Sequence, residues 1–484
     1  MNIKKVCILA LIGILLSSNA AFCAEKILVE KNTILSLKDC LNLALQNSPA
    51  IKKSRYNYGI SLNDITIAKS AFFPTLGLGT GYDLGSTRST RVDTNSNAYS
   101  AQANLNQLIF NFGKTNARIR MQKFYKIAAK YNFDNTVLDT VYTVMINYYG
   151  VLAAKANLDV ERANVQINER NYQRTKAYFD EGIRSKIDLV NAEVNLSDSK
   201  VALVTAEKTY QNAIVQLNNS MYIAYAPEYE IENTEAFNFS RNIIPVNLEK
   251  ISETKDLSSA PKEVSDAFLT SEVQKLDVLE DYKFKPFPYS FEESVEIANK
   301  NRPDLKSYKA TVDAMKQALL YIKREYYPEI KAAAGYGFRD KYSTNSYTLG
   351  ITASTNINIL QKKSEIDTGK LQVALAQNEV DKLEQDIYFE VQNLYINMKQ
   401  LEKQIPLLGV KVRQTLENFE LADGRYAVGI GDYIQLQDAK VNYNNAQQSY
   451  VRTVYNYNVA RANLEKAIGL QQEVTLTLDE DKKK

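Results

Sequence analysis

Two stretches of the chain alternate strictly between apolar and polar residues. The apolar positions are Tyr347, Leu349, Ile351, Ala353, Ile357 and Ile359 in residues 347–359, and Tyr99, Ala101, Ala103, Leu105 and Ile109 in residues 99–109. A period of two predicts strands that have one apolar and one polar face, and weaker partner strands are expected near residues 76–84 and 330–338. A sheet packed on a soluble core would show the same alternation. Strands of about ten residues with small polar side chains are more typical of an outer-membrane barrel, whose apolar face meets lipid.

Four strands are too few to close a barrel. An open sheet edge in lipid would leave backbone N–H and C=O groups without partners, so several chains must share one barrel. The smallest known membrane barrels have about eight strands, and a wide channel needs more. Three chains would supply twelve strands, and we therefore expect a trimer.

Residues 114–179 and 361–426 each predict one very long helix, on the order of 100 Å at 1.5 Å per residue. Apolar residues recur at every seventh position in two rows of the second stretch, offset from each other by four residues. The first row is Ile366, Val373, Val380, Ile387, Leu394, Leu401 and Leu408; the second is Val391, Met398, Ile405, Val412, Phe419 and Tyr426. A strict seven-residue repeat indicates coiled-coil packing. We expect the two rows to contact neighbouring helices on either side, and Pro406 to bulge or kink the helix beside Gly409.

Two glycine turns separate these helices from a second pair of heptad helices. Gly182 and Gly429 fit the position just after a helix end, and Ser185 and Asp432 fit the N-cap of the helix that follows. The pattern predicts two helical hairpins. We expect their tips to form the far end of a tube.

The chain contains an internal sequence repeat. Residues 36–49 read SLKDCLNLALQNSP and residues 290–303 read SFEESVEIANKNRP, at an offset of 254 that later settles at 247. Such register over two long segments indicates a duplication. Each copy predicts a short helix capped by Ser36 or Ser290, then a helix of about 22 residues that ends before the next proline. The chain then divides into a first repeat (24–220), an insert (221–289), a second repeat (290–470) and a tail (471–484).

Residues 1–23 have the features of a secretory signal peptide. Lys4 and Lys5 precede an apolar run over 6–16, and small residues follow. Cys23 leaves lipidation open, although Phe22 departs from the small residue that this signal prefers. After residue 24 we find no stretch with the roughly 18 apolar residues of a membrane helix, so strands are expected to cross any membrane.

Composition excludes several classes of function. The chain has no histidine and only 3 cysteines, which removes histidine-based catalysis and a disulfide framework. Its 59 Lys and Arg against 56 Asp and Glu argue against nucleic-acid binding through bulk charge. Gly113, Lys114 and Thr115 look like the end of a phosphate-binding loop, but Leu108 stands where its first glycine is required. No catalytic, cofactor-binding or metal-binding residue is predicted, and the chain is not expected to be an enzyme.

With these residues identified, the chain resembles the TolC family of outer-membrane efflux proteins. The resemblance covers about residues 36–220 and 290–470 and rests on the two repeat openings, on FDEGIRSKIDLVNA and RYAVGIGDYIQLQDA around the glycine turns, and on YNVARANLEKAIG near the end. It implies a mainly α fold with membrane β: a trimeric α/β barrel in which long antiparallel coiled-coil helices join four strands per chain to a shared twelve-stranded barrel.

The resemblance also implies a function and its partners. The chain would be the outer-membrane channel-tunnel of a tripartite efflux or type I secretion system in a Gram-negative-type bacterium, with a large periplasmic portion. Its partners would be two further copies of itself, a periplasmic membrane-fusion adaptor, an inner-membrane transporter and outer-membrane lipid. A periplasmic coiled-coil scaffold or adaptor without membrane strands is the alternative. The sequence does not separate export of small molecules from export of proteins.

The resemblance places the periplasmic entrance in the second hairpin. Two family aspartates that form carboxylate rings fall on Gln435 and Asp438, of which only Asp438 matches. The residues that hold the family entrance shut match Tyr426, Asp188 and, where the family has an arginine, Gly431. With that arginine missing, Arg184 or Lys186 paired with Asp432 is the expected substitute.

Overall fold

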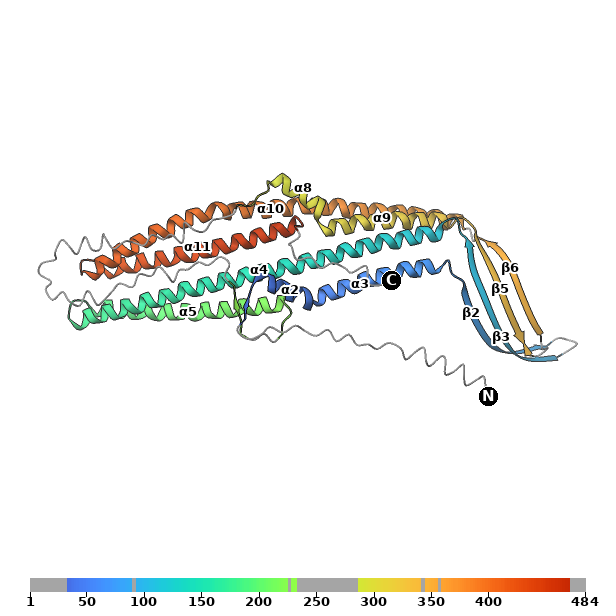
Figure 1. The fold of residues 1–484 in the computed structure, drawn as a ribbon, viewed down its shortest axis with the longest axis horizontal. Coiled ribbons are helices and arrows are strands. Elements are labelled where there is room, and N and C mark those ends of the chain that lie inside the picture. The colour runs from blue at the N-terminus through green and yellow to red at the C-terminus, as the bar shows by residue number, and fades with distance from the viewer. Residues whose placement is uncertain are drawn as a thin grey trace.

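The computed structural model describes residues 33–88, 93–224, 228–232, 286–340, 344–355 and 358–470. The expected signal peptide, most of the insert and the whole tail lie outside these residues. The molecule is long and narrow, with a strand sheet at one end and the tips of two helical hairpins at the other (Figure 1). Strands and hairpin tips are therefore separated by the full length of the long helices.

The four long strands form one antiparallel sheet in the order β2-β3-β5-β6. Its members are β2 (Thr75–Arg88), β3 (Asp93–Phe110), β5 (Glu329–Arg339) and β6 (Thr344–Ser354). Because β3 pairs with β5, the two repeats join in the middle of the sheet, and β2 and β6 are its edges. The strand expected over 347–359 was placed too far along the chain. It ends at Ser354, and Ile359 begins the next helix because the Asn358 side chain caps the backbone N–H of Gln361. Ile357 lies outside the described residues.

The sheet has one apolar and one polar face, as the alternation predicts. Leu349 and Ile351 on β6 are 89% and 72% exposed, and Leu78 on β2 is exposed to a similar extent. On the other face, polar side chains lie over glycines of the next strand. A Cβ added at Gly335 would approach Thr348 Oγ1 to 2.5 Å. Large apolar side chains left without protein neighbours are what a lipid-facing barrel wall requires.

The short helices follow the repeat closely. α2 (Leu37–Asn47) and α8 (Phe291–Asn301) each begin with a capping box, in which the N-cap serine and the third residue exchange hydrogen bonds. α3 (Pro49–Ser70) and α9 (Pro303–Arg324) each start at a proline and run for 22 residues. Proline suits a first helical turn because its missing N–H would have no partner there.

The long helices have the expected extents. They are α4 (Lys114–Asp180), α5 (Lys186–Ser220), α10 (Ile359–Ala427) and α11 (Tyr433–Ala467). α4 is the central helix, packed against α2, α3, α5, α9 and α11. One stretch of α4 is apolar enough by composition to cross a membrane, contrary to the sequence-based expectation. It is a core segment instead, because Val144, Tyr148 and Val151 are buried in the first hydrophobic cluster.

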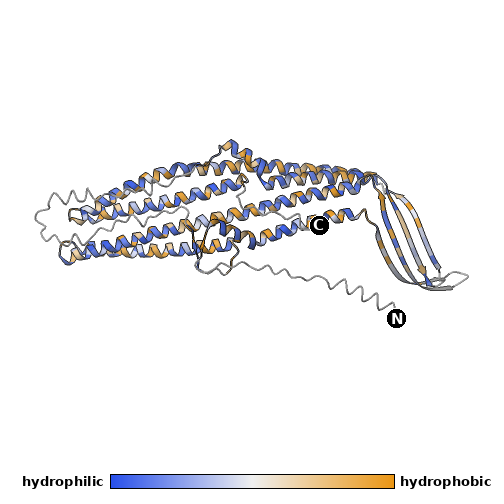
Figure 2. Ribbon diagram, in the orientation of Figure 1, coloured by the Kyte–Doolittle hydropathy of each residue, from blue (hydrophilic) through white to orange (hydrophobic). Residues whose placement is uncertain are grey.

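The two heptad rows of α10 do not face opposite neighbours. Ile387, Val391, Met398 and Ile405 are all buried in one cluster, together with Tyr450 and Val454 of α11. Rows offset by four residues are the a and d positions of a single coiled-coil face, which is why both lie in the same cluster. The bulge expected at Pro406 is also absent, since α10 is one continuous α-helix through this exposed residue. In Figure 2 apolar and polar residues alternate along every long helix.

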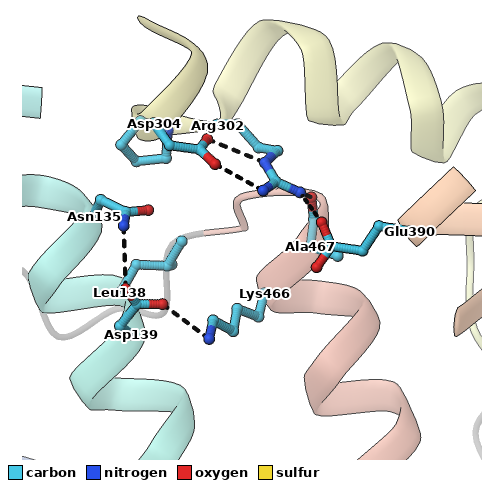
Figure 3. A pocket seen from close by; sticks show the side chains of 9 residues that line it. Asn135, Leu138, Asp139, Arg302, Asp304, Glu390, Lys466 and Ala467 are labelled. Atoms are coloured by element: carbon cyan, nitrogen blue, oxygen red, sulfur yellow. Dashed lines mark hydrogen bonds and ion pairs between the residues drawn. The ribbon is translucent and has the colours of Figure 1, made fainter. Parts of the chain in front are cut away.

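Near the middle of the molecule a charged junction ties the second repeat to α4 (Figure 3). Arg302 donates to Asp304, to Glu390 of α10 and, at 3.1 Å, to the carbonyl of Ala467 at the end of α11. Lys466 of α11 pairs with Asp139 of α4 at 2.8 Å. These groups line a polar pocket of about 150 Å³. Burial alone would raise the pKa of the Asp304 carboxyl, but the Arg302 guanidinium outweighs burial and holds that pKa below its usual range.

A small parallel pair of strands was not expected from the sequence. β1 (Ile34–Leu35) pairs with β4 (Glu230–Ile231) at the junction of the first repeat and the insert. Tyr148 of α4 donates to the carbonyl of Glu232 at 2.6 Å and fixes this strand pair against the core. Each strand has only two residues, which is too short to produce a readable alternation.

Candidate functional site at the hairpin tips

Both hairpins turn on glycines in the left-handed region. Gly182 has φ 75° and Gly429 has φ 81°, a conformation that costs other residues a clash at Cβ. In each turn the next N–H bonds back to the helix, from Ile183 to Tyr178 and from Ile430 to Arg425. The expected N-cap at Ser185 is present, since its hydroxyl accepts from the N–H of Asp188 at 3.3 Å. Asp432 stands at the N-cap with extended backbone, but its side chain makes no capping hydrogen bond, contrary to expectation.

Tyr426 is the centre of the contact between the two hairpins. It is 0% exposed, and its hydroxyl is 3.0 Å from Thr175 Oγ1 of α4. The guanidinium groups of Arg174 and Arg184 lie over its ring, with centroid distances of 5.1 and 4.6 Å. Cation–π contacts gain strength where water is excluded, so the buried ring is held by both cations.

Further bonds surround this tyrosine. Arg174 pairs with Asp423 of α10, and Tyr178 donates to the carbonyl of Ala427 at 2.8 Å. Asn195 of α5 donates to the hydroxyl of Tyr433 at 2.8 Å. All of these bonds run from the first hairpin to the second, so the two tips are fastened to each other by polar contacts.

Arg184 does not make the contact with Asp432 that was expected of it. It donates to the carbonyl of Gly431 at 2.9 Å and covers Tyr426, and it makes no pair with Asp432 among the described residues. An arginine at position 431 does not fit this backbone, because a Cβ there would lie 2.7 Å from the N atom of Tyr426. Asp188 is half-buried near Tyr433, and the described residues show no hydrogen bond from it to Tyr426. Lys186 is exposed.

Asp438 and Gln435 lie on an exposed side of α11. Lys440, two residues on, points the other way and is buried against α4. In the described part of the chain no three His, Cys, Asp or Glu side chains are grouped closely enough to hold a metal ion. The chemistry available at the tip is therefore charge and hydrogen bonding.

Above the tip, α4 and α11 continue to meet through buried polar side chains. Lys440 is 4% exposed and donates to Asn168 Oδ1 and to Gln437 Oε1. About two helical turns farther from the tip, Gln448 donates to Glu161, which is also buried. Burial lowers the pKa of Lys440 to about 8. We call the contact of α4 residues 144–175 with α11 residues 433–462 the α4–α11 seam.

Farther from the tip the α4–α11 seam becomes apolar. Val451 and Tyr455 of α11 are buried in one cluster with Val144 and Val151 of α4. The sequence-based reasoning missed the polar members of the seam. A signal for them exists, because Glu161, Asn168 and Thr175 are polar residues spaced by seven within a heptad helix. Polar residues at buried heptad positions fix register at a cost in stability.

Comparison with known proteins places this architecture in a family. The family model described as outer membrane efflux protein matches residues 40–221 and 295–470. Outer membrane protein TolC of Escherichia coli (strain K12) is 22% identical over 437 residues, which cover 89% of this chain and 81% of the relative. Outer membrane efflux protein BepC of Brucella suis biovar 1 is 23% identical over 201 residues, which cover 40% of this chain and 43% of the relative.

Solved structures share the fold. The outer-membrane channel CmeC of Campylobacter jejuni aligns over 93% of this chain and 90% of its own, with a TM-score of 0.69 and 15% identity. CusC aligns over 92% of this chain and 95% of its own, with a TM-score of 0.71 and 13% identity. The chain therefore belongs to the outer membrane efflux protein family and is an outer-membrane efflux channel whose long helices form a periplasmic tunnel.

Proposed function

We propose that three copies of this chain form one passive exit duct of a tripartite efflux or type I secretion system, with the hairpin tips as its periplasmic entrance. The observation that carries this proposal is the four-stranded sheet, which has one bare apolar face and two open edges. In lipid the edge strands β2 and β6 would leave backbone groups unpaired. Pairing β2 of one copy with β6 of the next closes twelve strands into a barrel.

The helices support the same assembly. Their contacts give the order α5-α4-α11-α10, so α5 and α10 are the outer helices of one copy. α5 exposes apolar residues at heptad spacing: Ile187, Val190, Val194, Val201 and Val204. α10 likewise exposes Leu407, Val410 and Leu421. A neighbouring copy would cover both faces and complete a closed wall of helices, as coiled-coil packing requires.

At the entrance, three Asp438 side chains would converge on one axis. Crowded carboxylates attract cations and repel anions, and salt screens the effect. With Gln435 in the other ring position, the cation preference would be present but modest. Tyr426, Arg174 and Arg184 would hold the tips together when the entrance is closed.

The remaining parts of the proposal concern processing and partners. Residues 1–23 would be removed as a signal peptide, and the insert 221–289 with the tail 471–484 would surround the tunnel at mid-height. A passive duct needs an energised pump, so a periplasmic membrane-fusion adaptor and an inner-membrane transporter would dock on it. The likeness to TolC, named as an outer membrane protein, and to BepC, named as an outer membrane efflux protein, supports this arrangement.

A matched pair of substitutions on β6 tests the proposal. Ile351→Arg would put a charge into lipid and cost about 2–4 kcal/mol near the bilayer midplane, so trimer yield in the outer membrane should fall. Thr352→Arg faces the lumen and should assemble as the wild type does. Native mass measurement in detergent gives the oligomer. A stable monomer in the membrane, extraction of the wild type by salt alone, or equal damage from both variants would contradict the proposal.

A further inference from the structure

We propose that Arg452 is a second selectivity-determining residue of the duct, and that three copies of it form a cationic ring deeper in the tunnel than the Asp438 ring. This inference rests on the proposed trimer and on the placement of Asp438 at the pore. It adds a charged element that opposes the entrance ring. The duct would then combine a preference for cations at its mouth with a preference for anions farther in.

Asp438 and Arg452 lie on the same exposed side of α11. Four residues spaced by seven along α11 have the same degree of burial. Ala439, Ala446, Thr453 and Ala460 are all buried. Asp438, Asn445 and Arg452 form the row just before them, and all three are exposed. Fourteen residues are two full heptads, so in a coiled coil Arg452 returns to the same side of the helix as Asp438. Whichever direction Asp438 faces, Arg452 faces it too.

The exposed side of α11 carries few charged side chains. Between Tyr433 and Ala460 the only charged side chains of α11 are Asp438, Lys440 and Arg452. Lys440 is buried against α4, so it does not belong to the exposed side. The rest of that side is uncharged, with Gln435, Asn442 and Asn445 exposed. Arg452 forms no ion pair with any described residue, so its charge is not cancelled within the chain.

The two proposed rings would be well separated along α11. At 1.5 Å per residue the two rings would be about 21 Å apart along the helix. The Debye length is about 10 Å at 0.1 M salt, so each ring acts on a permeating ion largely independently of the other. A cation would be attracted by the Asp438 ring and repelled by the Arg452 ring. An anion would be repelled by the Asp438 ring and attracted by the Arg452 ring. The net selectivity of the whole duct is therefore small.

This arrangement has a consequence for the class of substrate. A small ion of either sign meets one repelling ring, whereas an uncharged solute meets none. A solute that carries both signs on separate groups can present the favourable group at each ring in turn. The two rings therefore favour neutral and zwitterionic solutes over simple anions or cations.

Planar-bilayer recording of the purified trimer under a potassium chloride gradient tests the inference. Arg452→Gln should move the reversal potential toward the cation potential, with a rise of at least about twofold in the cation-to-anion permeability ratio at 0.1 M salt. Asp438→Asn should move it toward the anion potential. The double variant should return close to the wild-type value. Arg452→Lys keeps the charge and should match the wild type, which separates charge from side-chain shape.

The outcomes separate this inference from the proposed function. If Asp438→Asn shifts the reversal potential and Arg452→Gln does not, the second ring is overturned and the entrance placement stands. If neither variant shifts it, the exposed side of α11 does not face the pore, and both are overturned. If Arg452→Lys behaves like Arg452→Gln, the effect is one of fit and not of charge, which also overturns the inference.

Discussion

The two halves of the α4–α11 seam differ in chemistry although the same two helices form both. Near the tip, Glu161 and Asn168 of α4 are buried and accept hydrogen bonds from Gln448 and Lys440 of α11, respectively. Toward the middle of the molecule they are Val144 and Val151, in one cluster with Val451 and Tyr455. Separating apolar surfaces in water loses their burial energy, whereas separated polar groups regain hydrogen bonds from water. We therefore predict that the tip half separates more readily than the apolar half.

The two halves are also anchored differently. The tip is fastened by Tyr426 and its two arginines, and the far end by the Arg302 junction and the Lys466–Asp139 pair. The first set lies at the proposed entrance. The second set holds the ends of α9 and α11 to α10 and α4. Variants of the two sets should therefore affect different properties, namely conductance and stability.

The largest effect is expected from Tyr426→Ala. Truncating a fully buried aromatic side chain costs about 3–5 kcal/mol, and here the loss falls on the contact that joins the hairpins. Single-channel conductance in planar bilayers should rise several-fold. Tyr426→Phe keeps the ring under both arginines and removes one hydrogen bond worth about 1 kcal/mol, so it should open the channel much less. An unchanged conductance in Tyr426→Ala would show that this contact does not limit the entrance.

The next effect concerns the junction around Arg302. Arg302→Met removes the partner of Asp304 and Glu390 and leaves a half-buried carboxylate unpaired, at a cost of about 2–4 kcal/mol. The thermal midpoint of the trimer in detergent should fall, and single-channel conductance should stay at the wild-type value. The matched control is Lys316→Gln, which breaks an ion pair with Asp313 whose two side chains are 55% and 46% exposed. That control should change the midpoint little. A rise in conductance from Arg302→Met would erase the distinction between the two anchors.

The smallest effect is expected from Lys440→Met. Burial lowers the pKa of Lys440 from 10.5 to about 8, so the charged form destabilises the closed seam at pH 7. Methionine keeps the length and removes the charge, but it leaves Asn168 and Gln437 without a donor. The closed state should gain a net of about 1–2 kcal/mol, seen as a lower open probability in a Tyr426→Phe background.

The pH dependence of this gain has a definite sign. Because the closed-state pKa is lowered, the wild type is penalised in full below pH 8 and regains stability as the pH rises toward 10.5. The difference between Lys440→Met and the wild type should therefore shrink between pH 8 and pH 10.5. A difference that grows over this range would show that Lys440 is not buried as a cation in the closed seam.

Local features were predictable from the sequence. The capping boxes at Ser36 and Ser290, the prolines that start α3 and α9, and the glycines at both turns each depend on residues a few positions apart. The resemblance brought Tyr426 and Asp438 to one hairpin. The separate expectation that Arg184 pairs with Asp432 was wrong, because Arg184 contacts Gly431 and Tyr426 instead. The roles of Asp438, Gln435 and Asp188 at the entrance remain predictions.

The contacts that the sequence did not reveal depend on which helix faces meet. Glu161 and Asn168 are ordinary polar residues until α11 packs against α4, and nothing near them in the chain specifies that partner. The two heptad rows of α10 were assigned to opposite sides because periodicity gives spacing and not orientation. The strand end at Ser354 was missed because one capping side chain, Asn358, overrode two further apolar positions in the alternation.

The central claim is that the polar half of the α4–α11 seam opens while the apolar half stays closed. Two pairs of cysteines in the Tyr426→Ala background test it most directly when each pair is tethered by a reducible bifunctional thiol reagent long enough to replace a lysine side chain. Asn168→Cys with Lys440→Cys tethers α4 to α11 in the polar half, and Asp139→Cys with Lys466→Cys tethers the two helices just beyond the apolar half, where Lys466 Nζ contacts Asp139 at 2.8 Å. With the reagent attached, the first pair should return single-channel conductance to the wild-type level and the second should leave it high, with reductant reversing the first. High conductance that persists with the first pair tethered, or closure by the second pair, would contradict the account.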